Sequence, residues 1–275
     1  MAEMFRNRRN RQTNSEFNFE KYTRHQCDAL NASEGKLQDY DCSVCHNKGI
    51  VYFISGSNEI CSKDCSCMAV RNSIACIRTS GLQRLMKQYT LDEFHSETPL
   101  QQRMKNTALH FLNDETGKWF FVGGQSGAGK SHLCTAVSGE LLRRNVAVRY
   151  MLWKDESTRI KAVINDDSEY RKLVEPLKTV LVLYIDDLFK PVLDERGQRK
   201  QPNPGDIQLA FEIINARYIS GRVTIVSSEW TIEELQQIDP ATGGRIYQMA
   251  ESYCLSISPG KEKNYRLKGS RNYGN

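Results

Sequence analysis

Short apolar stretches, separated by longer polar ones, recur through the second half of the chain and predict buried strands. The five predicted strands cover residues 119–122, 146–151, 179–185, 223–226 and 253–257. Between them, apolar residues recur at helical spacing, as at Leu133, Val137 and Leu141. Strands that alternate with helices are typical of an α/β fold built on a parallel sheet.

Polar and helix-breaking residues set the predicted ends of the later helices. Residues 190–205 are rich in proline and glycine, so they predict a loop. Asp206 is the predicted N-cap of the next helix. Thr231 and Glu234 have the spacing of a capping box, and a further helix is predicted to begin at 243–245.

The first hundred residues carry a weaker pattern. Residues 49–54 predict a strand, and the polar residues 55–58 after it predict a turn. A linker over 89–100 leads into the α/β part. Helices are predicted within 26–41, over 68–88 with an interruption at Ser80–Gly81, and over 100–113 with Pro99 near the first turn.

Residues 124–131, between the first strand of the α/β part and the following helix, fit the phosphate-binding pattern G-x-x-x-x-G-K-[ST]. Glycines let backbone N–H groups turn toward phosphates, and the helix N-terminus adds a partial positive charge. Lys130 is expected to reach the β- and γ-phosphates, and Ser131 to bind Mg²⁺. The alternative is a chance glycine-rich turn before a helix. The expected nucleotide-binding residues are Gly124, Gln125, Ser126, Gly127, Ala128, Gly129, Lys130, Ser131 and His132.

Two adjacent acids follow the third strand of the α/β part. Asp186 is expected to complete the Mg²⁺ site with Ser131, and Asp187 to polarise the attacking water. The alternative is a pair of solvated acids in a turn. An extra strand between the phosphate-loop strand and the acidic strand is typical of ring-forming ATPases. The second acid agrees with this class, because it supplies a base for hydrolysis.

The chain has nine cysteines, and seven of them lie between Cys27 and Cys76. In a reducing compartment such a cluster indicates a metal site rather than disulfides. Two cysteine pairs, nineteen residues apart, flank a predicted strand at nearly the spacing of a zinc ribbon. The expected ligands of this structural zinc are Cys42, Cys45, Cys65 and Cys67. The second pair is C-x-C rather than C-x₂-C. Cys61 and His46 are therefore alternative candidates for the fourth ligand. The alternative is a set of small buried residues without a metal.

Composition excludes several classes of protein. Hydrophobic content of 39% and charged content of 26% are ordinary for a globular protein. No run approaches the roughly 18 apolar residues of a membrane span, and the first residues lack the apolar segment of a secretory signal. We therefore expect a cytoplasmic protein with no membrane partner. The net charge of +5 is modest, and the basic ends of the chain either contact phosphate backbones or are simply solvated.

Six motifs follow one another along the chain: GGQSGAGKSHL at 123–133, LYIDDLFK at 183–190, NARY at 215–218, SSE at 227–229, GRI at 244–246 and NYRL at 264–267. Together, over roughly residues 40–268, they resemble replicative helicase loaders of the DnaC/DnaI type, most of all the phage and prophage branch. The resemblance implies an AAA+ P-loop NTPase with a parallel five-stranded sheet of order 5-1-4-3-2, preceded by a small N-terminal zinc-binding domain. The implied division is a flexible basic arm (1–25), a zinc-binding helicase-interaction domain (26–90), an ATPase domain (91–268) and a basic tail (269–275).

The resemblance also implies roles for three arginines. Arg245 lies where such ATPases place the arginine finger that reaches a neighbour's γ-phosphate, which requires self-association. Arg217 is a second candidate for a contact across the subunit boundary. Arg266 lies where a sensor arginine contacts the nucleotide of its own subunit. The alternative for each is a surface arginine in an ion pair.

Two departures from the family pattern matter. Bacterial loaders commonly have Asn where this chain has Glu229, and a carboxylate there would repel the γ-phosphate. Ser228 is therefore the expected sensor, and Glu229 is expected to face elsewhere. Asp187 stands in place of the usual Glu and is one methylene shorter, which favours slow hydrolysis suited to a switch.

The resulting hypothesis is an ATP-dependent loader that places the hexameric replicative helicase on single-stranded DNA, using ATP, Mg²⁺ and Zn²⁺. One alternative is a transposition-helper ATPase that acts on duplex DNA and a transposase. Another is a zinc-containing DNA-binding regulator with a vestigial ATPase. The zinc module argues mildly against the first alternative, and the intact Lys130 and Asp186 argue against the second.

Overall fold

The computed structural model describes residues 18–79, 82–114, 116–260 and 263–265. The chain divides into two compact units, residues 1–68 and 69–275. The tail predicted at 269–275 lies outside the described residues, as does most of the arm predicted at 1–25. Within the described part of the chain, no helix is long and apolar enough to cross a lipid bilayer.

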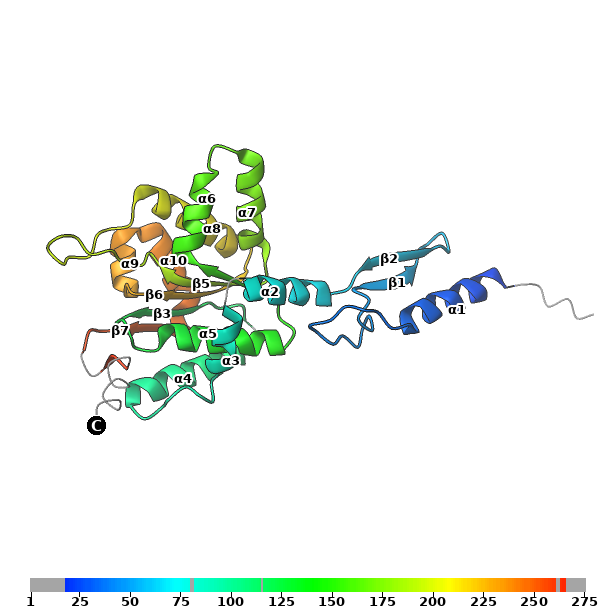
Figure 1. The fold of residues 1–275 in the computed structure, drawn as a ribbon, viewed down its shortest axis with the longest axis horizontal. Coiled ribbons are helices and arrows are strands. Elements are labelled where there is room, and N and C mark those ends of the chain that lie inside the picture. Colours follow the sequence, from blue (N-terminus) through cyan, green and yellow to red (C-terminus); the bar gives the residue numbers. More distant parts are fainter. Residues whose placement is uncertain (1–17, 80–81, 115, 261–262, 266–275) are drawn as a thin grey trace, which may run out of the picture. The chain divides into compact units, whose positions relative to one another are not determined.

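Residues 18–66, the described part of the first unit up to the start of α2, form one helix and one β-hairpin (Figure 1). They are α1 (Phe19–Ala32), β1 (Ile50–Ile54) and β2 (Ile60–Asp64), with the two strands antiparallel. The Asn31 amide joins α1 to β1, because it donates to the Tyr52 carbonyl and accepts from the Tyr52 N–H, both at 2.9 Å. The predicted strand and turn over 49–58 are confirmed. The helix begins before its predicted range because Asn18 caps it by accepting from the Lys21 N–H.

The second unit is built on a parallel five-stranded sheet. Its strands are β3 (Phe120–Gly124), β4 (Val148–Leu152), β5 (Val182–Leu188), β6 (Val223–Ser228) and β7 (Cys254–Ile257). Their order is β4-β5-β6-β3-β7, which confirms the predicted order 5-1-4-3-2 within this unit. The strand that separates β3 from β5 in the sheet is β6. Strand β4, which intervenes in the sequence, lies at the edge.

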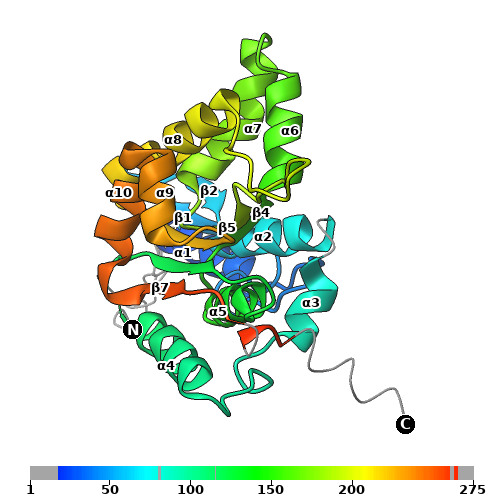
Figure 2. The ribbon, with the colours of Figure 1, turned by 90° about the vertical axis from the view of Figure 1, so that its left-hand side faces the viewer.

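Helices cover both faces of this sheet, with α6 to α10 on one side and α4 and α5 on the other (Figures 1 and 2). Each face carries its own apolar core. The helices are α2 (Cys67–Thr79), α3 (Leu82–Gln88), α4 (Pro99–Leu112), α5 (Lys130–Arg143), α6 (Trp153–Ala162), α7 (Asp167–Thr179), α8 (Pro204–Ile219), α9 (Ile232–Ile238) and α10 (Pro240–Ala250), with a 3₁₀ turn at Glu251–Tyr253.

The structure differs from the sequence pattern at three boundaries. The two compact units meet at 68/69, whereas the predicted domain boundary was 90/91. Helix α8 begins at Pro204 and is capped by Asn203, not by Asp206. Helix α10 begins at Pro240 and is capped by Asp239, earlier than predicted. In both helices a capping residue precedes a proline, whose fixed φ suits the first helical position.

Candidate nucleotide site and metal centre

The phosphate loop joins β3 to α5 in a conformation that requires glycine. Gly124 and Gly129 have φ values of 100° and 86°, which disfavour any residue with a Cβ. At Gly124 a Cβ would also lie 2.1 Å from the Ile257 carbonyl oxygen of the neighbouring strand β7. Gly129 has no side chain with which to cap α5, which leaves that helix end to a bound anion.

Lys130 begins α5 and is buried, with 6% of its surface exposed. Its ammonium group donates to the carbonyl oxygens of Gly124 and Gln125, both at 2.9 Å. Two carbonyl oxygens of the loop therefore bind the Lys130 ammonium group, which the phosphate-binding pattern predicts to contact a triphosphate.

Asp186, at the carboxyl end of β5, accepts hydrogen bonds from three hydroxyl groups. Ser131 donates to its Oδ1 at 3.1 Å, Ser227 to the same oxygen at 2.5 Å, and Tyr150 to its Oδ2 at 3.1 Å. Burial raises the pKa of Tyr150 well above its ordinary value, so this hydroxyl stays protonated and donates. The two predicted Mg²⁺ ligands, Ser131 and Asp186, thus lie together. Mg²⁺ usually takes only a few oxygen ligands from a protein and keeps several waters in its coordination shell.

Asp187 lies beside this centre in an unusual backbone conformation, with φ of 56°. Its N–H donates to Ser227 Oγ at 3.0 Å, which anchors the end of β5 to strand β6. Its Oδ2 forms an ion pair of 2.7 Å with the ammonium group of Lys190. The predicted water-polarising acid therefore lies in the site with a cation already beside it.

At the tip of β6 the structure reverses the expectation that Ser228 faces the nucleotide and Glu229 faces elsewhere. Ser228 is fully buried, where its hydroxyl donates to the Leu188 carbonyl at 2.7 Å and accepts from the Trp230 N–H. Glu229 lines the nucleotide cavity and accepts from Ser126 Oγ at 3.1 Å. Successive residues of a strand point to opposite faces, so the serine that contacts Asp186 is Ser227.

A cavity of about 240 Å³ lies over the phosphate loop. Its lining includes three residues that the sequence pattern did not single out, Tyr89, Lys190 and Tyr265. Lys190 and Tyr265 could have been found, since Lys190 closely follows the paired acids and Tyr265 lies in the NYRL motif, whereas Tyr89 belongs to none of the six motifs. The full lining is Tyr89, Ser126, Gly127, Gly129, Lys130, Ser131, His132, Asp187, Lys190, Glu229 and Tyr265.

Aromatic groups border the cavity near His132. The His132 ring stacks on Tyr89 with ring centroids 4.5 Å apart, and its Nε2 lies 3.0 Å from the Thr90 carbonyl oxygen. Burial lowers the pKa of His132 below its ordinary value, so the ring is neutral at neutral pH. The N–H of Tyr265 donates to the Gly127 carbonyl at 3.0 Å, which places the C-terminal segment on the phosphate loop.

The three arginines implied by the family pattern have different positions. Arg217 is fully buried and donates to Leu177 O at 2.8 Å and Val180 O at 3.0 Å, so it cannot reach a second subunit. Arg245 lies on α10 over the ring of Phe211, 5.0 Å from its centroid, and outside the cavity lining of its own chain. Arg266 lies outside the described residues.

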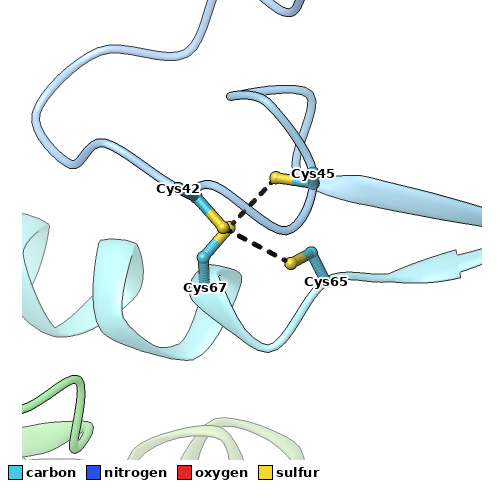
Figure 3. Close-up of side chains that lie close together, drawn as sticks. All are labelled: Cys42, Cys45, Cys65 and Cys67. Atoms are coloured by element: carbon cyan, nitrogen blue, oxygen red, sulfur yellow. Dashed lines mark hydrogen bonds between the residues drawn. The ribbon is translucent and has the colours of Figure 1, made fainter. Parts of the chain in front are cut away.

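Four cysteines of the first unit converge, two from the loop before β1 and two from the end of β2 and the start of α2, as Figure 3 shows. The sulfur atoms of Cys42, Cys45, Cys65 and Cys67 all lie within 4.8 Å of one another and are buried. The Cys42–Cys65 and Cys45–Cys67 sulfur distances are 3.8 and 3.6 Å. Four thiolates around one Zn²⁺, at 2.3 Å each, would lie about 3.8 Å apart. The four sulfurs fit tetrahedral zinc.

His46 and Cys61, the two alternative candidates for a zinc ligand, do not lie with these four cysteines. Among the described residues, neither belongs to the group that could hold a metal ion. Burial alone would raise the pKa of the Cys45 thiol, but the Gly49 N–H and the neighbouring sulfurs together lower it to about 6. The lowered pKa favours the thiolate at Cys45, which is the form that binds metal, whereas burial raises the pKa of Cys65.

The phosphate loop joins β3 to α5, the paired acids lie on β5, and strand β6 is inserted between β3 and β5. This arrangement defines the fold of a P-loop nucleotide-binding protein of the AAA+ type. Residues 60–253 match the family described as IstB-like ATP binding protein, and the chain belongs to that family.

Named relatives agree with the resemblance to helicase loaders. The phage-like element PBSX protein XkdC of Bacillus subtilis (strain 168) is 32% identical over 251 residues, 87% of this chain and 91% of XkdC. The replicative helicase loader DnaC of Escherichia coli (strain K12) is 21% identical over 187 residues, 61% of this chain and 76% of DnaC. The match to the crystal structure of DnaI spans 64% of this chain and 93% of the DnaI chain, with a TM-score of 0.51 and 19% identity. The two proteins therefore share the fold.

Proposed function

We propose that this chain hydrolyses ATP and thereby controls the loading of a hexameric replicative helicase onto single-stranded DNA. The observation that carries the proposal is the convergence of Lys130, Ser131, Asp186 and Asp187 at one end of the sheet, in a chain of an ATP-binding family. The similarity to a protein named replicative helicase loader supports the choice of partner.

Each residue of the site has a part in the proposed hydrolysis. Mg²⁺, when bound with ATP, would neutralise charge on the phosphates. Lys130 would release the carbonyls of Gly124 and Gln125 and turn to the β- and γ-phosphates. Ser131 and Asp186 would hold the ion, while Tyr150 and Ser227 keep the Asp186 carboxylate in one orientation. Asp187 would orient and polarise the attacking water.

Hydrolysis by this site would also depend on assembly. Arg245 would complete the site of a neighbouring subunit, and Arg266 would contact the nucleotide of its own subunit. The assembled, ATP-bound state would hold single-stranded DNA and helicase, and hydrolysis would release them. A nucleotide can shift that equilibrium only through contacts that differ between the two states.

The first unit is the proposed contact with the helicase. The zinc site would stabilise a unit too small for a large apolar core of its own. Helix α1 exposes Phe19, Tyr22 and Leu30, with 62%, 46% and 39% of each residue's surface exposed. Exposed apolar residues grouped on one helix are typical of an interaction surface.

Phosphate release from ATP, with and without single-stranded DNA, tests the enzymatic part of the proposal. We expect Lys130→Ala to abolish hydrolysis, because the variant loses the ammonium group that is proposed to reach the γ-phosphate. Equal inactivity of wild type and variant would contradict an active ATPase and favour the vestigial alternative.

Co-purification of the full chain with a hexameric replicative helicase tests the partner. We expect Tyr22→Ala to weaken the complex at least tenfold, and Lys21→Ala, which changes a charged neighbour on the same helix, to leave it within twofold. Capture of a transposase without any helicase would favour the transposition-helper alternative instead.

A further inference from the structure

Lys190 lines two cavities at once. One is the nucleotide cavity described above, and the other is a groove of about 380 Å³ between α6 and the loop that leads to α8. Its ammonium group, 2.7 Å from Asp187 Oδ2, lies in an ion pair with the acid proposed to polarise water. The same side chain is therefore within reach of the hydrolytic site and of whatever occupies the groove.

The groove carries a strong excess of positive charge. Lys154, Lys161, Lys190 and Lys200 line it, and Asp206 is the acid among its lining residues. Lys161 pairs with that acid at 2.5 Å, and Lys190 pairs with Asp187. Lys154 and Lys200 are exposed and add two further positive charges. A polyanion is the ligand that such a surface attracts.

The size of the groove favours one nucleic-acid strand. A duplex meets proteins over a broad surface, whereas a single strand follows a narrow basic groove with its phosphodiester backbone. The aromatic residues of the groove, Trp153 and Phe189, are buried, with 3% and 4% of their surfaces exposed. Binding there would consequently rely on charge more than on base stacking, and so would tolerate any sequence.

The loop that forms one wall of the groove also contacts the opposite side of the nucleotide cavity. Arg199 donates to the Glu229 carbonyl oxygen at 3.1 Å and lies over the ring of Trp230. The Glu229 carboxylate in turn accepts from Ser126 of the phosphate loop. The loop is thus linked to the nucleotide cavity at Lys190 and again at Glu229.

We propose that Lys190 is a positioning residue that holds Asp187 in an ion pair until a phosphodiester in the groove draws the ammonium group away. While the pair is closed, Lys190 occupies Asp187 Oδ2, so this carboxylate oxygen is not available to orient the attacking water. When single-stranded nucleic acid enters, a phosphate oxygen replaces the Asp187 carboxylate as the partner of Lys190. Asp187 is then free to polarise water. The proposal rests on the proposed function, because it assumes that the site hydrolyses ATP.

The test measures phosphate release by the full chain with Mg²⁺ and ATP, in the presence and absence of an oligothymidylate. We expect Lys190→Ala to raise the DNA-free rate severalfold and to remove stimulation by the oligonucleotide, and Lys190→Arg to behave as wild type. A Lys190→Ala variant that is slower than wild type under both conditions would overturn the proposal, because Lys190 would then act directly on the phosphates. An unchanged DNA-free rate would overturn it as well.

The groove itself is tested by Lys154→Ala and Lys200→Ala, which change no residue of the hydrolytic site. We expect both to keep the DNA-free rate, to lose at least half of the stimulation, and to lower the salt dependence of oligonucleotide binding by about one ion each. Normal stimulation in both variants would overturn the assignment of the groove. If wild type is no faster than Lys130→Ala with or without the oligonucleotide, the proposed function fails instead, and the two failures are distinguishable.

Discussion

Arg217 stabilises the fold by satisfying carbonyl groups that would otherwise be buried without partners. Its guanidinium group donates to carbonyls at the C-terminal end of α7, including Leu177 O and Val180 O, and to Thr224 Oγ1 at 2.9 Å. The last carbonyls of a helix lack partners within that helix, and arginine is well suited to supply them. Burial lowers the pKa of Arg217 to about 9, which still leaves it charged at neutral pH.

We predict that Arg217→Ala destabilises the second unit by about 3 kcal/mol or more, because several buried carbonyls lose their donor together. Urea unfolding measures the change. The matched control is Arg159→Ala on the exposed side of α6, which should stay within about 0.5 kcal/mol of wild type. A stable Arg217→Ala variant that has lost only its ATPase activity would return Arg217 to the subunit boundary.

His132 makes the stability of the second unit depend on pH. Burial lowers the pKa of its ring in the folded chain, while the ring in the unfolded chain titrates near about 6.5. Below that pH the unfolded chain binds a proton that the folded chain does not, so stability falls as the pH falls. We predict that the difference in unfolding free energy between wild type and His132→Gln shifts against wild type from pH 7 to pH 5. Parallel pH profiles of urea unfolding would contradict this prediction.

At the scale of elements, the hairpin of the first unit depends on cysteines at both of its ends. Cys42 and Cys45 precede β1, Cys65 follows β2, and Cys67 begins α2. Partly buried Tyr40 and Val51 are the apolar residues packed on this cluster. So small an apolar core contributes little, and four ligand bonds would supply most of the stabilisation.

We predict that Cys65→Ser lowers the zinc content by about one ion per chain and makes residues 18–68 sensitive to proteases, because three ligands bind zinc far more weakly than four. The matched control is Cys61→Ser on β2, which changes the same residue type outside the cluster and should keep its zinc. Metal analysis and limited proteolysis under conditions that protect thiols measure both variants. Loss of zinc in Cys61→Ser but not in Cys65→Ser would contradict the ligand set.

Local pattern was sufficient to predict the five strands of the parallel sheet and the place of the phosphate loop between a strand and a helix. Continuous apolar runs mark buried strands, and the spacing of Gly124, Lys130 and Ser131 is fixed by the loop itself. Side-chain direction was not predictable in the same way. Ser227 and Ser228 are both buried in β6, and only the packing of β6 against β5 decides which one contacts Asp186.

Residues brought in from distant parts of the chain were also missed. Tyr89 and Tyr265 lie far from the phosphate loop in sequence, and although Tyr265 belongs to the NYRL motif, that motif drew attention to its arginine rather than its tyrosine. Arg217 was expected at a subunit boundary because of the family resemblance, with a surface ion pair as the alternative, yet it is fully buried. These positions depend on how the helices close over the sheet, which hydrophobic spacing does not specify.

At the scale of the whole molecule, the nucleotide site is expected to be shared between subunits. Arg245 does not line the nucleotide cavity of its own chain. Its guanidinium group donates to the Ala241 carbonyl at 2.9 Å and lies over the rings of Phe211 and Tyr218, which hold it half-buried between α10 and α8. An arginine held in this way on one subunit could complete the site of a neighbour with little loss of side-chain entropy.

We predict that two inactive variants, Arg245→Ala and Lys130→Ala, recover activity when they are mixed. In a mixed assembly some boundaries combine the intact phosphate loop of one variant with the intact Arg245 of the other. Random mixing in equal amounts completes about one quarter of the sites, because each boundary needs both intact partners. The matched control is a mixture of Lys130→Ala with Asp186→Asn, whose faults both lie in the same half of the site, so no boundary is complete. Recovery in the first mixture alone assigns Arg245 to the neighbour's site, whereas equal inactivity of both mixtures would mean that Arg245 serves only its own chain.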